Sequence, residues 1–148
     1  MIEVRVAERR QMALVCRLEA RCFGIERVLY GQWQRVGGPG VVTWIAYVDA
    51  AAAGFLISYL YDIDAISCPY VAVLGVVPQH RRLGVARALL QTMLLRHGAA
   101  WLHVRASNAS AIALYAAMCF TVVRRVSAYY RDGEDALLMR TVVLQAPD

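Results

Sequence analysis

Three polar side chains stand close together in an otherwise apolar part of the chain: His103, Asn108 and Tyr115, within "LHVRASNASAIALY". Histidine accepts protons near neutral pH, whereas a phenol, with a reference pKa of about 10, stays protonated and can donate one. Asn108 and Tyr115 are seven residues apart, so on a helix they share a face. The face that Asn108 and Tyr115 share is one that could border a ligand. Taken singly, each also fits a structural role, as a helix cap or a partly buried ring.

A second segment with chemical potential is "VVPQHRRLGVARALL". Gly84 and Ala86 remove side-chain bulk at the predicted start of a helix, where free N–H groups and the helix dipole favour an anion. Arg81, Arg82 and Arg87 add positive charge at the same place. The segment therefore predicts an anion site, although a loop glycine beside a solvated basic surface would have the same sequence.

The order of these motifs resembles the GNAT acetyltransferase superfamily, and within it the RimI-type enzymes that acetylate the N-terminal amine of a ribosomal protein. The resemblance rests on an apolar strand ending at Pro78, then "RRLGVA", "LHVRASNASAIALY" and "AYYRDGEDALLM". It is dense from Val71 to Met139 and faint before Val71. It implies a GNAT fold, acetyl-CoA as cosubstrate, and direct transfer of acetyl to a primary amine, above all the α-amine of a protein.

The resemblance also implies a role for each site residue. Asn108 contacts the cofactor, and Tyr115 lies near its sulfur and protonates the departing thiolate. Tyr129 and Tyr130 resemble a tyrosine pair that holds the acceptor peptide; an aromatic cross-strand pair is the alternative. The other cofactor contacts are a strand segment that pairs with the pantetheine arm (Leu74, Gly75, Val76) and the turn that binds the pyrophosphate (Arg81, Arg82, Leu83, Gly84, Val85, Ala86, Arg87).

His103 departs from the RimI-type pattern, which usually has a glutamate as general base at this position. A histidine with a pKa near 6.5 is largely neutral at pH 7–8 and is able to accept the proton of an amine. An α-amine has a pKa of only about 7.7–8.0, against about 10.4 for lysine, and so demands less of the base. The alternatives are an enzyme for a small-molecule amine or a lysine side chain, or a catalytically weak acyl-CoA-binding regulatory domain. Glu26 and Tyr30 fall in the region that lines the peptide pocket of relatives, without an assignable role.

Hydrophobic periodicity and turn residues predict the elements that must position these side chains. Strands and helices alternate in the middle of the chain and hairpins close both ends, which predicts an α/β fold. Its centre is a mixed, mostly antiparallel sheet of about six to seven strands with helices on both faces. The strands are expected over 2–7, 41–48, 54–61, 70–77, 101–105, 120–130 and 135–144, the last two joined across Asp132 and Gly133, and the helices over 8–23, 25–36, 84–98 and 107–117.

The length of 148 residues predicts one domain over 1–148, large enough to bury its own core. Hydrophobic residues make up 59% of the chain, but the longest uncharged apolar run, 65–77, contains Pro69 and is too short to span a membrane. The start of the sequence does not resemble a signal peptide, so we expect a cytoplasmic protein without membrane contact.

Four cysteines show neither C-x-x-C pairing nor histidines at metal-ligand spacing, so we expect no metal and interpret Cys119 as a core residue rather than a nucleophile. The net charge of +5 indicates an anionic partner. Its concentration at Arg81–Arg87 favours a phosphorylated cofactor over nucleic acid. The expected partners are therefore acetyl-CoA and a peptide or protein N-terminus, for a monomer or weak dimer.

Overall fold

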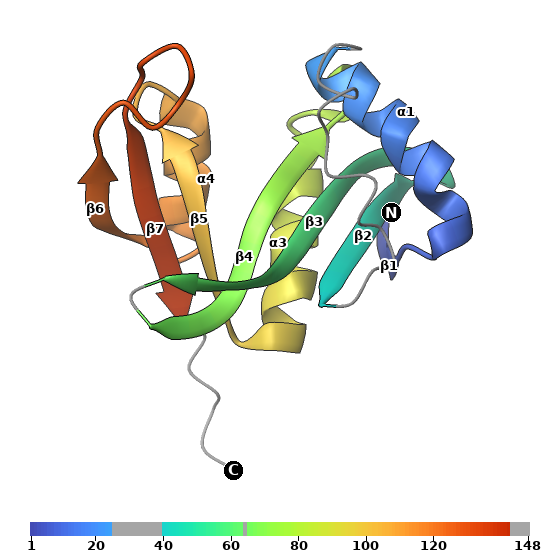
Figure 1. The fold of residues 1–148 in the computed structure, drawn as a ribbon. Coiled ribbons are helices and arrows are strands. Elements are labelled where there is room, and N and C mark those ends of the chain that lie inside the picture. The colour runs from blue at the N-terminus through green and yellow to red at the C-terminus, as the bar shows by residue number, and fades with distance from the viewer. Residues whose placement is uncertain (25–39, 64, 143–148) are drawn as a thin grey trace.

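A seven-stranded sheet forms the centre of the protein, in the order β1-β2-β3-β4-β5-β7-β6. The computed structural model describes residues 1–24, 40–63 and 65–142 (Figure 1). Every neighbouring pair of strands is antiparallel except β4 and β5, which confirms the predicted mixed sheet. The strands are β1 (Ile2–Val6), β2 (Val41–Val48), β3 (Ala51–Ile63), β4 (Ile66–Val76), β5 (Ala99–Arg105), β6 (Thr121–Val126) and β7 (Ala136–Val142).

Helices cover both faces of the sheet, as predicted (Figure 1). On one face, Val15 and Leu18 of α1 pack against side chains of β2, β3 and β4. On the other face, Leu89 and Met93 of α3 and apolar residues of α4 pack against the opposite side chains of the same sheet. The helices are the short η1 (Arg9–Gln11), α1 (Met12–Phe23), the short η3 (Pro78–His80), α3 (Val85–His97) and α4 (Ala109–Ala117). The helix expected over 25–36, with Glu26 and Tyr30, lies outside the described residues.

Turn and cap residues explain where the elements begin and end. Gly98 ends α3 in a left-handed conformation with φ 76°, which a glycine adopts without strain. Asn108 begins α4 as its cap, because its side-chain oxygen accepts the N–H of Ala111 at 3.3 Å. Asp49 and Ala50, with φ 47° and 72°, form the tight turn between β2 and β3, so β3 begins earlier than predicted.

The last hairpin differs from the prediction. The strand expected over 120–130 ends at Val126, and residues 127–135 form a loop before β7. Within the loop, Ala128 has a φ of 49° and donates its N–H to the carboxylate of Asp135 at 2.9 Å, which turns the backbone away from the strand path. The left-handed Gly133 occupies the predicted turn, but far from the end of β6.

The expectation that Cys119 is a core residue was wrong, because its side chain is exposed. It follows the end of α4 with a φ of 66°, so the turn out of the helix directs it away from the core. Of the helices in the described ranges, none is long and apolar enough to cross a membrane.

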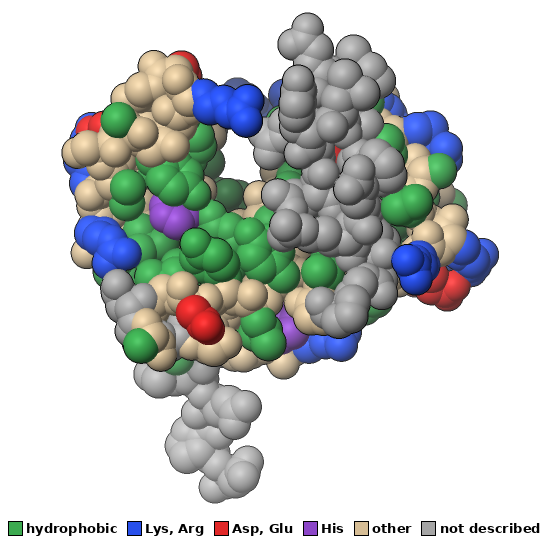
Figure 2. Space-filling view, in the orientation of Figure 1, with side chains coloured by type: hydrophobic (Ala, Val, Ile, Leu, Met, Phe, Trp, Pro, Cys, Tyr) green, Lys and Arg blue, Asp and Glu red, His purple; other side chains and the backbone are tan. Residues whose placement is uncertain are grey.

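The central feature of the sheet is the divergence of its two parallel strands. β4 and β5 pair only at Tyr70 and Trp101. From there toward the end of β4 the strands separate, so that β1–β4 and β5–β7 form the two arms of a V (Figure 1). In the space-filling view the surface is hollowed between these arms (Figure 2).

Candidate active site

The cleft between the arms collects the residues that the sequence marked for catalysis and acceptor binding. It has a volume of about 390 Å³. Its lining comes from both faces of the sheet, since Leu102 and Val104 belong to the core under α3 and α4, whereas alternation along β5 turns His103 to the opposite face. The lining residues are Phe23, Tyr70, Val71, Ala72, Val73, Leu74, Leu102, His103, Val104, Arg105, Asn108, Tyr115, Tyr129 and Tyr130.

The edge of β4 that faces the cleft carries backbone groups that β5 does not reach. The N–H of Val77 bonds to the carbonyl of Ala53 at 2.8 Å, and polar groups alternate sides along an antiparallel strand. Leu74 and Val76 therefore turn their N–H and C=O toward the cleft, whereas Gly75 turns its own toward β3. This edge offers an extended ligand a strand-like partner.

Gly75 is required by packing rather than by the open edge. A Cβ at this position would lie 3.0 Å from the ring of Phe55 and 3.1 Å from both the sulfur of Cys22 and the ring of Phe23. The missing side chain therefore lets the end of α1 pack closely over β4. Gly75 thus lies between Leu74 and Val76, whose backbone groups face the cleft, and its own contact with a pantetheine arm stays a prediction.

The turn between β4 and α3 has the backbone conformation of a candidate anion site. Arg82 and Gly84 both have left-handed backbones, with φ 64° and 85°, and Gly84 caps the start of α3. Such turns direct successive N–H groups into one concavity, and the dipole of α3 adds to their positive potential. The Nε of Arg81 donates to the carbonyl of Val76 at 3.0 Å and thereby links the turn to the open edge of β4.

This turn opens into a second pocket of about 440 Å³, next to α4. Most of the predicted pyrophosphate residues line it, together with Ser110 and Leu114 of α4. The full lining is Val76, His80, Arg81, Arg82, Gly84, Val85, Ala86, Arg87, Ser110 and Leu114. Leu83 is exposed and does not line the pocket. Because Asn108 and Tyr115 line the central cleft while Ser110 and Leu114 line this pocket, α4 borders both.

Tyr115 projects from α4 into the central cleft, with its ring 5.6 Å from that of Phe120. Burial, and then the nearby Tyr130, raise the pKa of its phenol to about 12. The phenol is therefore protonated throughout the neutral pH range in which activity would be measured. It is suited to donate a hydrogen bond to a developing anion in the cleft.

His103 is held by two aromatic neighbours. The hydroxyl of Tyr70 lies 2.6 Å from its Nδ1, and the ring of Tyr129 stacks on the imidazole with 4.3 Å between centroids and an angle of 12°. Burial, and then the charge of Arg124, lower the pKa of His103 below its usual 6.5. The imidazole is therefore mostly neutral at pH 7 and is able to accept a proton.

Tyr70 lines the cleft beside His103, and the sequence alone did not single it out. Burial, and then its contact with the hydroxyl of Tyr129, raise the pKa of its phenol well above the usual value, so it stays protonated. It lies at the only pairing between β4 and β5, where the cleft begins. The sequence offered one signal for this residue, namely a tyrosine at the start of the apolar run 70–77. The strand formed by that run lies next to β5, which carries His103.

Tyr129 and Tyr130 lie in the loop 127–135 and contact each other edge to face, at 5.0 Å between centroids. Neither belongs to β6 or β7, so the alternative of a cross-strand pair is wrong. Both line the central cleft. The structure thus brings together His103, Asn108, Tyr115, Tyr129 and Tyr130, and places the arginine turn in the adjoining pocket.

Comparison with known proteins gives one consistent result. The Acetyltransferase (GNAT) family model matches residues 11–120. The N-alpha-acetyltransferase of Sulfurisphaera tokodaii is 41% identical over 110 residues, covering 65% of this chain and 66% of that protein. The chain spans between half and about two thirds of the length of the curated relatives it matches.

Solved structures agree with the sequence comparison. The crystal structure of the ribosomal-protein-S18-alanine N-acetyltransferase from Escherichia coli superposes with a TM-score of 0.79 at 26% identity, over 100% of this chain and 97% of that one. Arabidopsis thaliana NAA60 in complex with acetyl-CoA has the same fold, with a TM-score of 0.81 at 23% identity over 97% of this chain and 99% of that one. The family match and the shared fold agree with the open β4 edge, the phenol of Tyr115 in the cleft and the arginine-rich turn in the adjoining pocket: the chain belongs to the GNAT family of acetyltransferases, which use acetyl-CoA as acyl donor.

Proposed function

We propose that the chain is an N-terminal acetyltransferase of RimI type, which transfers acetyl from acetyl-CoA to the α-amine of a protein. The observation that carries the proposal is the meeting of Tyr115 and His103 in one cleft from opposite faces of the sheet. An acyl donor bound on the side of α3 and α4 and an acceptor amine bound on the other side of the sheet then meet only in the gap between β4 and β5. The names of the relatives support the α-amine as acceptor.

The cofactor lies along β4 and the arginine turn. Its pantetheine arm pairs with the backbone of Leu74 and Val76, and its pyrophosphate binds the N–H groups at the start of α3, with Arg81, Arg82 and Arg87 around it. Asn108 and Tyr115 border the same path from α4. The thioester thereby reaches the central cleft beside the phenol of Tyr115.

The reaction is a direct transfer. The free amine attacks the thioester carbonyl, the C–N bond forms, and the C–S bond of the tetrahedral intermediate breaks. Tyr115 donates its proton toward the leaving sulfur, whose thiol has a reference pKa of about 8.5. Because that thiol is more acidic than a phenol with a pKa of about 12, the main contribution of Tyr115 is a hydrogen bond that stabilises the thiolate.

Tyr70 and His103 take the proton that the amine releases. We assign His103 the tautomer in which Nδ1 carries no proton, so that this nitrogen accepts the hydroxyl proton of Tyr70 across the 2.6 Å that separate the two atoms. As the amine, directly or through one water, gives its proton to the Tyr70 oxygen, the proton already on that oxygen moves to Nδ1. The imidazolium then returns the proton to solvent.

The weak base is consistent with an α-amine. The lowered pKa of His103 leaves it less able to deprotonate a lysine, with a pKa of about 10.4, than an α-amine of about 7.7–8.0. We further propose a single catalytic domain over residues 1–148, acting in the cytoplasm on a nascent or ribosomal protein. The alanine acceptor of the E. coli relative makes a small first residue the first choice.

An acceptor panel tests the proposed function. Purified enzyme and acetyl-CoA are incubated with an Ala-initiated peptide, the same peptide with a blocked N-terminus and an internal lysine, and a set of small amines. Mass spectrometry then locates the acetyl group. We expect transfer to the free α-amine with kcat/KM at least about tenfold above the lysine peptide. Preferred acetylation of lysine or of a small amine would overturn the proposal, as would CoA binding without turnover on any acceptor.

A further inference from the structure

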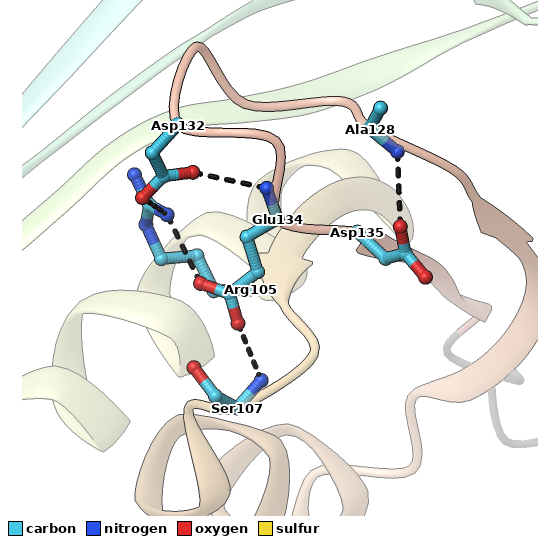
Figure 3. A network of polar contacts seen from close by, with 6 residues as sticks. All are labelled: Arg105, Ser107, Ala128, Asp132, Glu134 and Asp135. Atoms are coloured by element: carbon cyan, nitrogen blue, oxygen red, sulfur yellow. Dashed lines mark hydrogen bonds and ion pairs between the residues drawn. The ribbon is translucent and has the colours of Figure 1, made fainter.

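A network of charged side chains ties the loop 127–135 to the junction between β5 and α4 (Figure 3). Nη1 of Arg105, the last residue of β5, lies 2.8 Å from the carboxylate of Asp132 and 3.0 Å from that of Glu134. The second oxygen of Glu134 accepts the N–H of Ser107 at 2.9 Å. Asp132 in turn accepts the N–H of Glu134 at 3.0 Å.

The same arginine supports a tyrosine of the site. The guanidinium carbon of Arg105 lies 4.1 Å from the centre of the Tyr130 ring, within the range of a cation–π contact. The N–H of Tyr130 bonds to the carbonyl of Glu134 at 3.1 Å. Tyr130 is therefore fixed both through its ring and through its backbone, and Tyr129 next to it is stacked on His103.

The network joins the two sides of the site. Ser107 directly precedes Asn108, the cap of α4, and α4 carries Tyr115. Glu134 belongs to the loop that carries Tyr129 and Tyr130. One carboxylate thus sets the spacing between the helix on the cofactor side and the loop on the acceptor side.

We propose that Arg105 and Glu134 are positioning residues that hold the Tyr129–Tyr130 loop at a fixed distance from α4, so that the acceptor amine is aligned with the thioester. This inference rests on the proposed function, because it assigns the loop to the acceptor. Neither residue is a catalytic group. Their effect is on geometry, where a displacement of about 1 Å costs about 10²-fold in rate.

If the network only stabilised the fold, its loss would appear as a loss of folding stability. Exposed ion pairs add little to folding stability, and Arg105 keeps 42% of its side chain exposed. The ends of β5 and β7 also remain paired through the backbone, with the N–H of Ala106 on the carbonyl of Asp135 at 3.0 Å. Loss of the network is therefore expected to loosen the loop without unfolding the sheet.

The chain offers a matched control on the same loop. Nε of Arg125 bonds to the carboxylate of Asp135 at 2.7 Å, with 61% of the arginine side chain exposed. This pair also joins an arginine to an acidic residue of the loop, but it reaches neither Tyr130 nor the start of α4. Arg125→Gln is expected to leave peptide kinetics within about twofold of wild type.

Kinetics with the acceptor peptide provide the first test. Arg105→Gln and Glu134→Gln are each expected to lower kcat/KM for the peptide by about 10- to 100-fold. The Kd for acetyl-CoA is expected to change by less than about twofold, because Asn108 still caps α4. If the two residues act through each other, the double variant is no slower than the slower single variant. Additive losses, equal losses in Arg125→Gln, or wild-type kinetics in both variants would overturn the proposal.

Hydrogen exchange provides a second test that needs no activity. Arg105→Gln is expected to speed exchange at the amides of Ser107 and Tyr130 by at least about tenfold, while Arg125→Gln leaves both unchanged. Unchanged protection at these amides would show that the network does not hold the loop. If the wild-type enzyme acetylates no peptide, the proposed function is wrong, and the exchange result still decides whether Arg105 and Glu134 fix the loop.

Discussion

Gly84 gives a sharp test of the cofactor site because its side-chain position faces open space. A Cβ built there meets no atom within 4 Å, so the first atom of a new side chain fits without a clash. The remaining cost is conformational, because φ is 85°, and asparagine and aspartate tolerate this region better than other residues. Gly84→Asn and Gly84→Asp therefore form a pair of nearly equal size and backbone preference that differ by one negative charge.

The size of the effect follows from that charge. A carboxylate about 4 Å from a phosphate charge is repelled by about 1 kcal/mol in bulk water and about 4 kcal/mol at an effective dielectric constant of 20. These limits correspond to about 5-fold and about 1000-fold in Kd. Arg81, Arg82 and Arg87 line the same pocket and offset part of the repulsion. We expect CoA to bind Gly84→Asp about 10- to 100-fold more weakly than Gly84→Asn.

Calorimetric titration with CoA measures this difference. Thermal unfolding of the two variants checks that both are equally folded, and the gap in Kd should shrink at 0.5 M salt, where the screening length falls to a few ångströms (~4 Å). S-acetylpantetheine, which lacks the pyrophosphate, should serve both variants equally as donor. Equal CoA affinities for Gly84→Asn and Gly84→Asp would refute the pyrophosphate site at this turn.

Three further predictions concern the packing, the base and the acceptor. Gly54→Ala places a Cβ 2.7 Å from the carbonyl of Gly75, so overpacking should cost about 1–3 kcal/mol of unfolding free energy in a denaturant titration; an unchanged midpoint would contradict the close approach of β3 and β4. The acceptor amine, with a pKa of about 7.7–8.0, makes kcat/KM fall with decreasing pH in both enzymes. The lowered pKa of His103 predicts a second fall below about pH 6.5 that His103→Gln removes, which a pH–rate profile of both enzymes checks; identical profiles would make His103 a bystander. Tyr129→Ala removes the ring stacked on His103 and should raise the peptide KM about tenfold or more with little change in acetyl-CoA affinity; a proportional loss of both would indicate general unfolding instead.

Much of the fold was predictable because it depends on local patterns. The apolar run 70–77 predicted the central β4, the spacing of Val85, Leu89 and Met93 predicted α3, and Asn108 predicted the start of α4. The turn before α3 was also predictable, because Gly84 marked the start of this helix in the sequence.

The features that escaped prediction depend on contacts between distant segments. The hydrogen bond between Tyr70 and His103 joins residues 33 positions apart, and no local pattern reports it. The end of β6 at Val126 depends on the carboxylate of Asp135, which captures the N–H of Ala128 across the loop. The exposure of Cys119 follows from the direction in which the chain leaves α4, whereas its apolar neighbours indicated burial.

The most direct test of the account is the rate of acetyl transfer by Tyr115→Phe with an Ala-initiated peptide. The substitution keeps the ring that packs near Phe120 and removes only the hydroxyl. Acetyl-CoA should therefore bind with wild-type affinity, while single-turnover transfer slows by about 10²- to 10⁴-fold, or about 3–5 kcal/mol of barrier. Transfer at the wild-type rate by a stable Tyr115→Phe enzyme would contradict the claim that the cleft between β4 and β5 stabilises the departing thiolate through this phenol.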